Sequence, residues 1–218
     1  MKVCGLLHSW QVEDRSRNIP LPSGHMNNAR SRTIALLAAA GAFLLTGCST
    51  STFSMDEIRA QLTTKPAHLN VLNMLQGTWT TEGTIEFIGQ DAPARVTGRS
   101  TAEWDCDGRV LIDHSDYDIA DFGPMRGVSI WTADEKPGTF QIHWFDSFGE
   151  TATGTARWEA STRTLKIRTK GKNALCNVVN DGTVRQIDPN TLEWTWEQHD
   201  ATRIVRYSTM RGTSKRIK

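Results

Sequence analysis

From Trp79 to the C-terminus, apolar residues recur at every second position, and this period constrains the fold more than any other feature of the chain. In residues 95–106, Val96, Ala102 and Trp104 fall on one side, and Arg95 and Arg99 fall on the other. Successive side chains of a β-strand point to opposite faces of the sheet. The alternation therefore indicates strands with one buried and one solvated face.

Ten segments carry this strand pattern, and turn-forming residues separate many of them. Such turns are expected at residues 107–108, 136–138, 148–149, 181–182 and 188–190. Short strands in unbroken succession predict an all-β fold, an antiparallel up-and-down β-barrel of about ten strands, since closure leaves no free edge. The predicted strands are residues 79–88, 95–106, 110–117, 127–132, 140–145, 151–158, 164–169, 183–187, 192–198 and 203–210.

One or two short helices are expected to precede the barrel. Ser54 and Glu57 have the spacing of a capping box, which predicts a helix from there to about Leu62. Pro66 then opens a second segment, with leucines at positions 69, 72 and 75 at helical spacing and Gly77 as its stop.

The N-terminal part of the chain is typical of a bacterial lipoprotein signal peptide. The basic residues Arg30 and Arg32 precede the apolar run 34–45, and Leu45-Thr46-Gly47-Cys48 follows as a lipobox. The run is about a dozen residues long, short of the ~20 that a membrane-spanning helix needs. We therefore expect residues 1–47 to be removed, Cys48 to carry lipid such as palmitate, and Met26 to be the true translation start.

This interpretation sets the expected organisation and location. Residues 48–65 would form a lipidated tether and a short helix, residues 66–212 the barrel domain, and residues 213–218 a basic C-terminal tail. Because Ser49, not Asp, follows the lipidated cysteine, we expect anchoring in the outer membrane, facing the periplasm. From Cys48 onward, 20 Lys and Arg stand against 22 Asp and Glu. This balance gives no electrostatic reason to expect a nucleic-acid partner.

Cys106 and Cys176 are the remaining cysteines of such a mature domain. In an oxidising compartment they are candidates for a disulfide, and the alternative is two separate buried thiols. The sequence leaves both readings open.

Two sets of residues resemble known families. Leu75-Gln76-Gly77-Thr78-Trp79 resembles the opening L-x-G-x-W motif of calycin-type barrels such as lipocalins and fatty-acid-binding proteins, in which the Trp plugs the closed end. Residues 126–127, 140–147, 154 and 164–165 follow the order found in a bacterial family of uncharacterised, single-domain calycin-like proteins, with an aromatic-x-x-x-W-x-D-S strand and turn. The resemblance covers roughly residues 66–212, but the later motifs of true lipocalins are missing. It implies a fold and carries no activity.

No catalytic or metal-binding motif stands out. The sequence has no G-x-S-x-G elbow, P-loop, dinucleotide fingerprint or H-E-x-x-H motif. Asp146 and Ser147 form the most suggestive polar pair, and we favour an Asx-turn there over a polar contact at the barrel mouth. An enzyme that combines Asp146 with His143 or His114 is the least favoured reading, because His143 faces opposite Trp144 along an extended strand.

Tryptophan usage gives the leading functional hypothesis, a barrel that binds a small apolar or amphipathic ligand without transforming it. Trp194 and Trp196 share a strand face with Leu192, and together the tryptophans suit the wall of a cavity. The resemblance to fatty-acid-binding barrels implies arginines as partners of a ligand carboxylate. The alternative is an envelope scaffold with a filled barrel. No cofactor is indicated, although haem or a fatty acid would suit such an interior. The candidate ligand-binding residues are Trp79, Trp104, Arg126, Trp144, Asp146, Trp194, Trp196 and Arg206.

Overall fold

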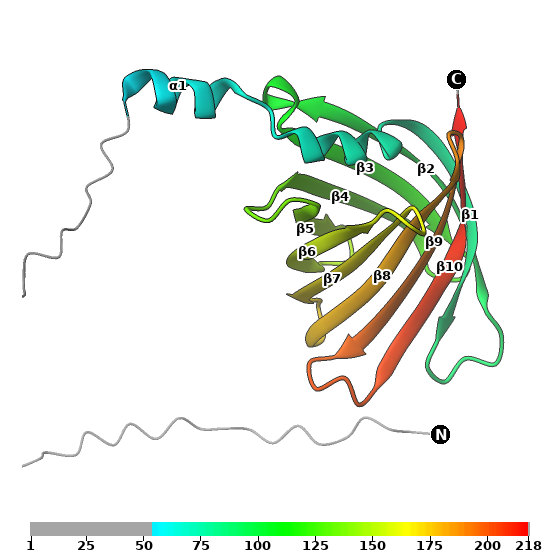
Figure 1. Cartoon of the computed structure of the whole chain (residues 1–218). Coiled ribbons are helices and arrows are strands. Elements are labelled where there is room, and N and C mark those ends of the chain that lie inside the picture. The colour runs from blue at the N-terminus through cyan, green and yellow to red at the C-terminus, as the bar shows by residue number, and fades with distance from the viewer. Residues whose placement is uncertain (1–53, 218) are drawn as a thin grey trace, which may run out of the picture. The chain divides into compact units, whose positions relative to one another are not determined.

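The computed structural model describes residues 54–217, which contain a closed barrel of ten antiparallel strands (Figure 1). The strands are β1 (Gly77–Phe87), β2 (Ala94–Asp105), β3 (Val110–Ile119), β4 (Gly123–Ala133), β5 (Thr139–Asp146), β6 (Thr151–Glu159), β7 (Thr164–Lys172), β8 (Asn177–Asp188), β9 (Thr191–Asp200) and β10 (Arg206–Ile217).

Every strand pairs with its neighbour in sequence, and β1 pairs with β10 to close the barrel. The closing register runs from Thr78 opposite Ile217 to Phe87 opposite Ser208. The predicted all-β, up-and-down barrel is confirmed. Successive strands run in opposite directions, so the five connections that follow odd-numbered strands lie at one end of the barrel. We call this the open end and the other the closed end.

The predicted helices are also found. Helix α1 (Met55–Thr63) begins with the capping box, in which Ser54 Oγ accepts from the Glu57 amide at 3.1 Å and Glu57 Oε2 accepts from the Ser54 amide at 2.8 Å. The second segment is a 3₁₀ helix, η1 (Ala67–Met74), whose three-residue turn keeps Leu69 and Leu72 on one buried face. A short 3₁₀ turn, η2 (Cys106–Gly108), follows β2, and among residues 54–217 no helix combines the length and apolar character required to cross a membrane.

Helix η1 covers the closed end of the barrel (Figure 1). Leu69 and Leu72 belong to a core cluster with Trp79, Leu111 and Phe140, all at most 2% exposed. Trp79 Nε1 donates to the carbonyl oxygen of Leu75 at 2.8 Å, which ties the first strand to the end of the helix. The tryptophan of the L-x-G-x-W motif thus closes this end, as the calycin resemblance implies.

The turn predicted at Asp181-Gly182 is wrong, because both residues lie inside β8. An Asp-Gly pair favours turns locally, but here glycine serves packing. A Cβ at Gly182 would lie 2.1 Å from Cε3 of Trp196 on the neighbouring strand. The absence of a side chain at this position makes room for the Trp196 ring.

The C-terminal boundary of the barrel also differs from the prediction. Residues 213–217 were expected as a basic tail, but they belong to β10, where Thr213 pairs with Glu82 and Ser214 with Thr81. Residues 203–205, expected as strand, lie in the connection from β9 to β10. The last strand therefore lies further along the chain than its apolar pattern indicated.

The candidate Cys106–Cys176 disulfide is not formed. Both cysteines are free thiols, but Cys106 is exposed and Cys176 is half-buried, so the alternative of two buried thiols does not describe them either. Cys106 follows β2 at the closed end, whereas Cys176 follows β7 at the open end. Tilted strands of about ten residues separate these ends by roughly 20 Å, and a disulfide requires Cα atoms within ~7 Å. The lipobox, Cys48, the signal peptide and the start at Met26 lie outside the described residues.

Candidate functional site

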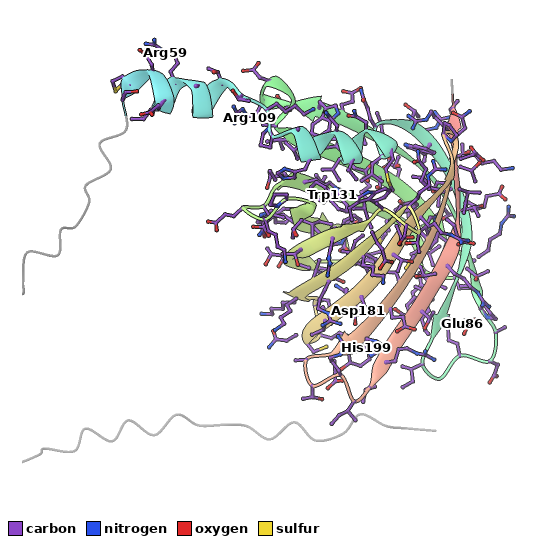
Figure 2. The ribbon with its side chains drawn as sticks, viewed as in Figure 1. Arg59, Glu86, Arg109, Trp131, Asp181 and His199 are labelled. Atoms are coloured by element: carbon purple, nitrogen blue, oxygen red, sulfur yellow. The ribbon has the colours of Figure 1, made fainter. Side chains whose placement is uncertain are left out.

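The interior of the barrel contains a cavity of about 370 Å³, so the barrel is not completely filled. Trp131 lies next to the closed end, which η1 covers (Figure 2), and lines the cavity there. Met125, Phe148 and Gln198 line it near the open end. Aromatic and aliphatic side chains from nearly all strands form most of the wall, and a few polar side chains interrupt it. They include Trp79, Ile85, Phe87, Val96, Asp113, Ser115, Tyr117, Ile119, Trp131, Ile142, Trp144, Glu150, Ile167, Val184, Leu192, Trp194, Trp196 and Met210.

Five of the eight residues proposed from the sequence line this cavity. They are Trp79, Trp144, Asp146, Trp194 and Trp196. Period-2 alternation places each on the inner face, as expected from the sequence.

Trp104 is in a different place from the one predicted. Its Nε1 donates to Asn73 Oδ1 at 2.9 Å, and Lys65 Nζ lies 3.8 Å from the centre of its ring. These partners belong to the segment that covers the closed end. Trp104 therefore helps to attach η1 to the barrel instead of forming a wall of the cavity.

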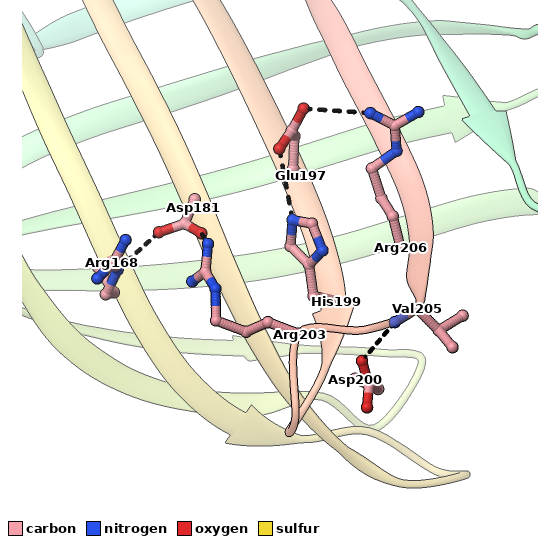
Figure 3. A network of polar contacts seen from close by, with 8 residues as sticks. All are labelled: Arg168, Asp181, Glu197, His199, Asp200, Arg203, Val205 and Arg206. Atoms are coloured by element: carbon pink, nitrogen blue, oxygen red, sulfur yellow. Dashed lines mark hydrogen bonds and ion pairs between the residues drawn. The ribbon is translucent and has the colours of Figure 1, made fainter.

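The two arginines proposed as ligand partners face outward. Arg126 is 85% exposed and lies 3.4 Å from Asp116. Arg206 is 57% exposed and lies 3.5 Å from Glu197, which also contacts His199 on the outer face (Figure 3). In the same view, Asp181 pairs with Arg168 and Arg203. The register of β10 against β9 shifts between Arg206 and Ser208. Arg206 therefore does not continue the alternation of the inward-facing residues that follow it. Both arginine predictions are wrong.

Asp146 combines the two roles that the sequence presented as alternatives. Its Oδ1 accepts from the amides of Phe148 and Glu150 at 2.9 and 3.0 Å, which forms the expected Asx-type turn. Its Oδ2 accepts from Trp144 Nε1 at 3.0 Å. The carboxylate thereby orients an aromatic wall residue at the mouth of the cavity.

A polar network at the open end surrounds Glu150. Glu150 Oε1 accepts from Asn180 Nδ2, and Oε2 accepts from Gln198 Nε2, both at 2.7 Å. Burial raises the pKa of the Glu150 carboxyl above its usual value, and the two amide donors oppose this shift only in part. Asp146, which is nearby, raises the pKa further.

A second polar group, which we call the Asp113 cluster, consists of Ser100, Asp113, Ser115 and Tyr117 on β2 and β3. Ser115 Oγ donates to Asp113 Oδ2 at 3.0 Å. Asp113 Oδ1 is buried and forms no hydrogen bond of regular geometry within residues 54–217, although the Ser100 hydroxyl lies close enough to the carboxyl to affect its pKa. Burial raises the pKa of Asp113 despite the opposing effects of Ser115 and Ser100. Burial also raises the pKa of Tyr117 to about 12, so its hydroxyl stays protonated.

Neither Asp113 nor Glu150 was singled out from the sequence. The signal for Asp113 was present, because it alternates with Leu111 and Ser115 on the inner face of β3. Glu150 gave no comparable signal. It immediately precedes β6, and the turn that Asp146 organises directs it toward Asn180 and Gln198.

His143, which the enzyme hypothesis paired with Asp146, faces out of the barrel. His143 pairs with Ile130 and Thr153 and alternates with the inward-facing Ile142 and Trp144. Within residues 54–217, no group of three His, Cys, Asp or Glu side chains is placed to hold a metal ion.

Large apolar side chains are exposed on all five connections of the open end. They are Ile88, Phe122, Phe148, Leu175 and Ile204, with exposures from 44% to 92%. Phe148 also lines the cavity, and Phe122 stacks on Phe87 with ring centres 4.4 Å apart. We call this set the apolar rim.

Comparison with known proteins identifies a family and a fold. The sequence profile described as "Protein of unknown function (DUF1579)" matches residues 63–214. A search of curated proteins gives no match.

Among solved structures, the chain is similar to Rv2717c from M. tuberculosis. The TM-score is 0.58 at 13% identity, covering 71% of this chain and 100% of that one. It is also similar to the S-type phycobiliprotein lyase CPES from Guillardia theta. There the TM-score is 0.50 at 7% identity, with 73% and 97% of the two chains covered. At these identities the likeness concerns the fold alone.

Proposed function

The chain belongs to the DUF1579 family of proteins of unknown function, and on that premise we propose that its barrel binds a small apolar or amphipathic molecule without transforming it. The observation that carries the proposal is the cavity of about 370 Å³. Its size falls within the range of small-molecule sites, and its wall has the usual composition, predominantly apolar with a few placed polar groups.

The architecture supports binding inside the barrel. Helix η1 and Trp79 cover one end, and side chains at the opposite end, such as Phe148 and Gln198, line the cavity. A ligand would therefore enter between the loops of the open end. The similarity in fold to a phycobiliprotein lyase is compatible with this proposal but does not specify a ligand.

Fluorescence titration tests the proposal, because Trp144, Trp194 and Trp196 line the cavity. The neutral dye N-phenyl-1-naphthylamine is expected to change tryptophan emission saturably. Met210→Trp places a larger side chain in the cavity and should weaken dye binding at least about tenfold. Arg211→Trp makes the matched exchange on the outer face and should leave the affinity unchanged. Equal affinities of the two variants, or no saturable change with this dye, haem or fatty acids, would contradict binding in the barrel.

We further propose that the domain is a lipoprotein of the bacterial outer membrane, anchored through Cys48 and facing the periplasm. The lipobox and the preceding basic and apolar segments support this proposal. Cys48→Ala should move the protein from the membrane fraction to the soluble fraction, whereas Ser49→Ala should not. Sedimentation of Cys48→Ala with membranes would refute the anchor.

A further inference from the structure

We propose that the ligand's polar end is an uncharged or cationic hydrogen-bond donor, such as an alcohol or an amine, and that Asp113 receives it. This inference rests on the proposed binding function and specifies the class of ligand. It departs from the fatty-acid expectation that the calycin resemblance raised.

The charged groups that line the cavity disfavour an anionic ligand. Among the described residues, the ionisable acids that line it are Asp113, Asp146 and Glu150, and no Lys, Arg or His side chain lines it. A buried anion without a compensating cation is strongly disfavoured. A ligand carboxylate in this cavity would lie near three carboxyl groups and find no positive charge.

Because the candidate arginines face outward, they are not placed to pair with a ligand carboxylate inside the barrel. Arg126 and Arg206 are the two arginines that the sequence offered for a carboxylate, and both lie in ion pairs on the outer face. Each would have to leave its partner and pass through the wall of the barrel to meet a bound ligand.

Several hydrogen-bond donors of the cavity wall already have acceptors within the protein. Trp131 Nε1 donates to Ser129, Trp144 Nε1 to Asp146, and Gln198 Nε2 to Glu150. The buried atom that remains without a partner on the cavity wall is an acceptor, Oδ1 of Asp113.

An unpartnered buried acceptor favours a donor from the ligand. Leaving such an atom unsatisfied is unfavourable, and a donor placed next to it removes this penalty. Asn180 Oδ1, behind the Glu150 network, is a second buried acceptor without a partner. Asn180 does not line the cavity, so the acceptor that a ligand can satisfy is Oδ1 of Asp113.

The neighbours of Asp113 define the subsite. Ser100 and Ser115 lie beside the carboxyl, and Tyr117 follows on the same face of β3. Ile85, Val96 and Ile119 form an apolar cluster further toward the open end. A ligand with an apolar body and one donor at its tip would place the body among these side chains and the tip against Asp113.

A matched series of dodecyl compounds tests the inference on the full chain. Dodecylamine, dodecanol and dodecanoate carry the same apolar body with a cationic, neutral or anionic end, and each is titrated below micelle formation against bound N-phenyl-1-naphthylamine. Dodecylamine and dodecanol should each displace the dye at concentrations at least about tenfold lower than dodecanoate. Asp113→Asn should reduce the preference for dodecylamine over dodecanoate severalfold, whereas Asp116→Asn, an exposed carboxyl on the same strand, should preserve it.

The outcomes separate this inference from the function on which it rests. If the dye binds but dodecanoate competes as well as the other two or better, the inference is wrong and the binding function stands. An unchanged preference in Asp113→Asn overturns the role of Asp113. Absence of dye binding removes the proposed function itself. If Asp113→Asn does not fold, Ser115→Ala serves as the second variant: it removes the donor to Oδ2, leaves a second free acceptor on Asp113 and should raise the preference for the amine severalfold, and an unchanged preference would overturn the role of Asp113.

Discussion

Trp144 donates its indole N–H to Asp146, two residues further along β5, and the same carboxylate accepts the amides that form the following turn. A wall residue of the cavity and the geometry of an open-end loop therefore depend on one side chain. Asp146→Ala should lower the free energy of unfolding by about 1–3 kcal/mol, because it leaves these donors without an acceptor. Urea unfolding measures the loss. Asp146→Asn retains one acceptor and should lose less; an equal loss in both variants would contradict a hydrogen-bonding role.

The raised pKa of Glu150 should make the stability of the protein depend on pH. Burial raises the pKa of its carboxyl in the folded state, so between its unfolded and folded pKa values the folded protein binds more protons than the unfolded chain. Its contribution is therefore most favourable below the unfolded pKa, and it is lost as pH rises through the folded pKa. Glu150→Gln should make the stability fall less with rising pH, measured by urea unfolding from about pH 4 to about pH 8. Asp113→Asn should act in the same direction, because burial raises that pKa as well. Parallel pH profiles for Glu150→Gln and the parent would refute the assignment.

The close packing of the Trp196 ring on Gly182 should couple β8 and β9 energetically. Its added Cβ would meet the ring of Trp196 at 2.1 Å, and a rigid indole has to shift to admit it. Gly182→Ala should cost about 1–3 kcal/mol of stability and change the tryptophan emission. In the Trp196→Ala background the same exchange should cost at least about 0.5 kcal/mol less, since nothing is left to clash. Additive losses in this double-mutant cycle would show that the ring does not impose the glycine.

Phe148 predicts control over ligand exchange. It lines the cavity, belongs to the apolar rim and is 44% exposed. Provided that the barrel binds N-phenyl-1-naphthylamine, Phe148→Ser should speed release of the dye at least about threefold in stopped-flow measurements. Phe145→Ser is the matched control, because Phe145 is 45% exposed on the same hairpin but faces outward. Equal release rates in the two variants would argue against a gate at this loop.

The period of the sequence predicted most of the barrel because alternation is a local property. It indicated the strands, the helix start at Ser54 and the inward position of Trp194 and Trp196. The errors arose where a residue distant in sequence determines the local backbone structure or the direction of a side chain. Gly182 lies within a strand, where its missing side chain leaves room for the Trp196 ring. Arg206 points outward next to a register shift between β9 and β10.

Two further results depended on relations between strands. The ends occupied by Cys106 and Cys176 follow from whether an even- or odd-numbered strand precedes each cysteine, which requires the correct strand count. Asp113 lay in a predicted strand, but its importance became clear only when the cavity and its unpartnered oxygen were known.

The pairing of β1 with β10 has a consequence for how the chain acquires its structure. Nine of the ten strand pairs join consecutive strands and can form as hairpins, whereas the tenth joins Thr81 to Ser214, whose hydroxyl oxygens are 2.8 Å apart across 133 residues of sequence. Contacts of such long sequence separation form slowly because the loop-closure entropy comes first. Until β10 is available, β1 therefore keeps one edge unpaired. A barrel that lacks β10 would expose the unpaired edges of β1 and β9, which are sites where another strand can add.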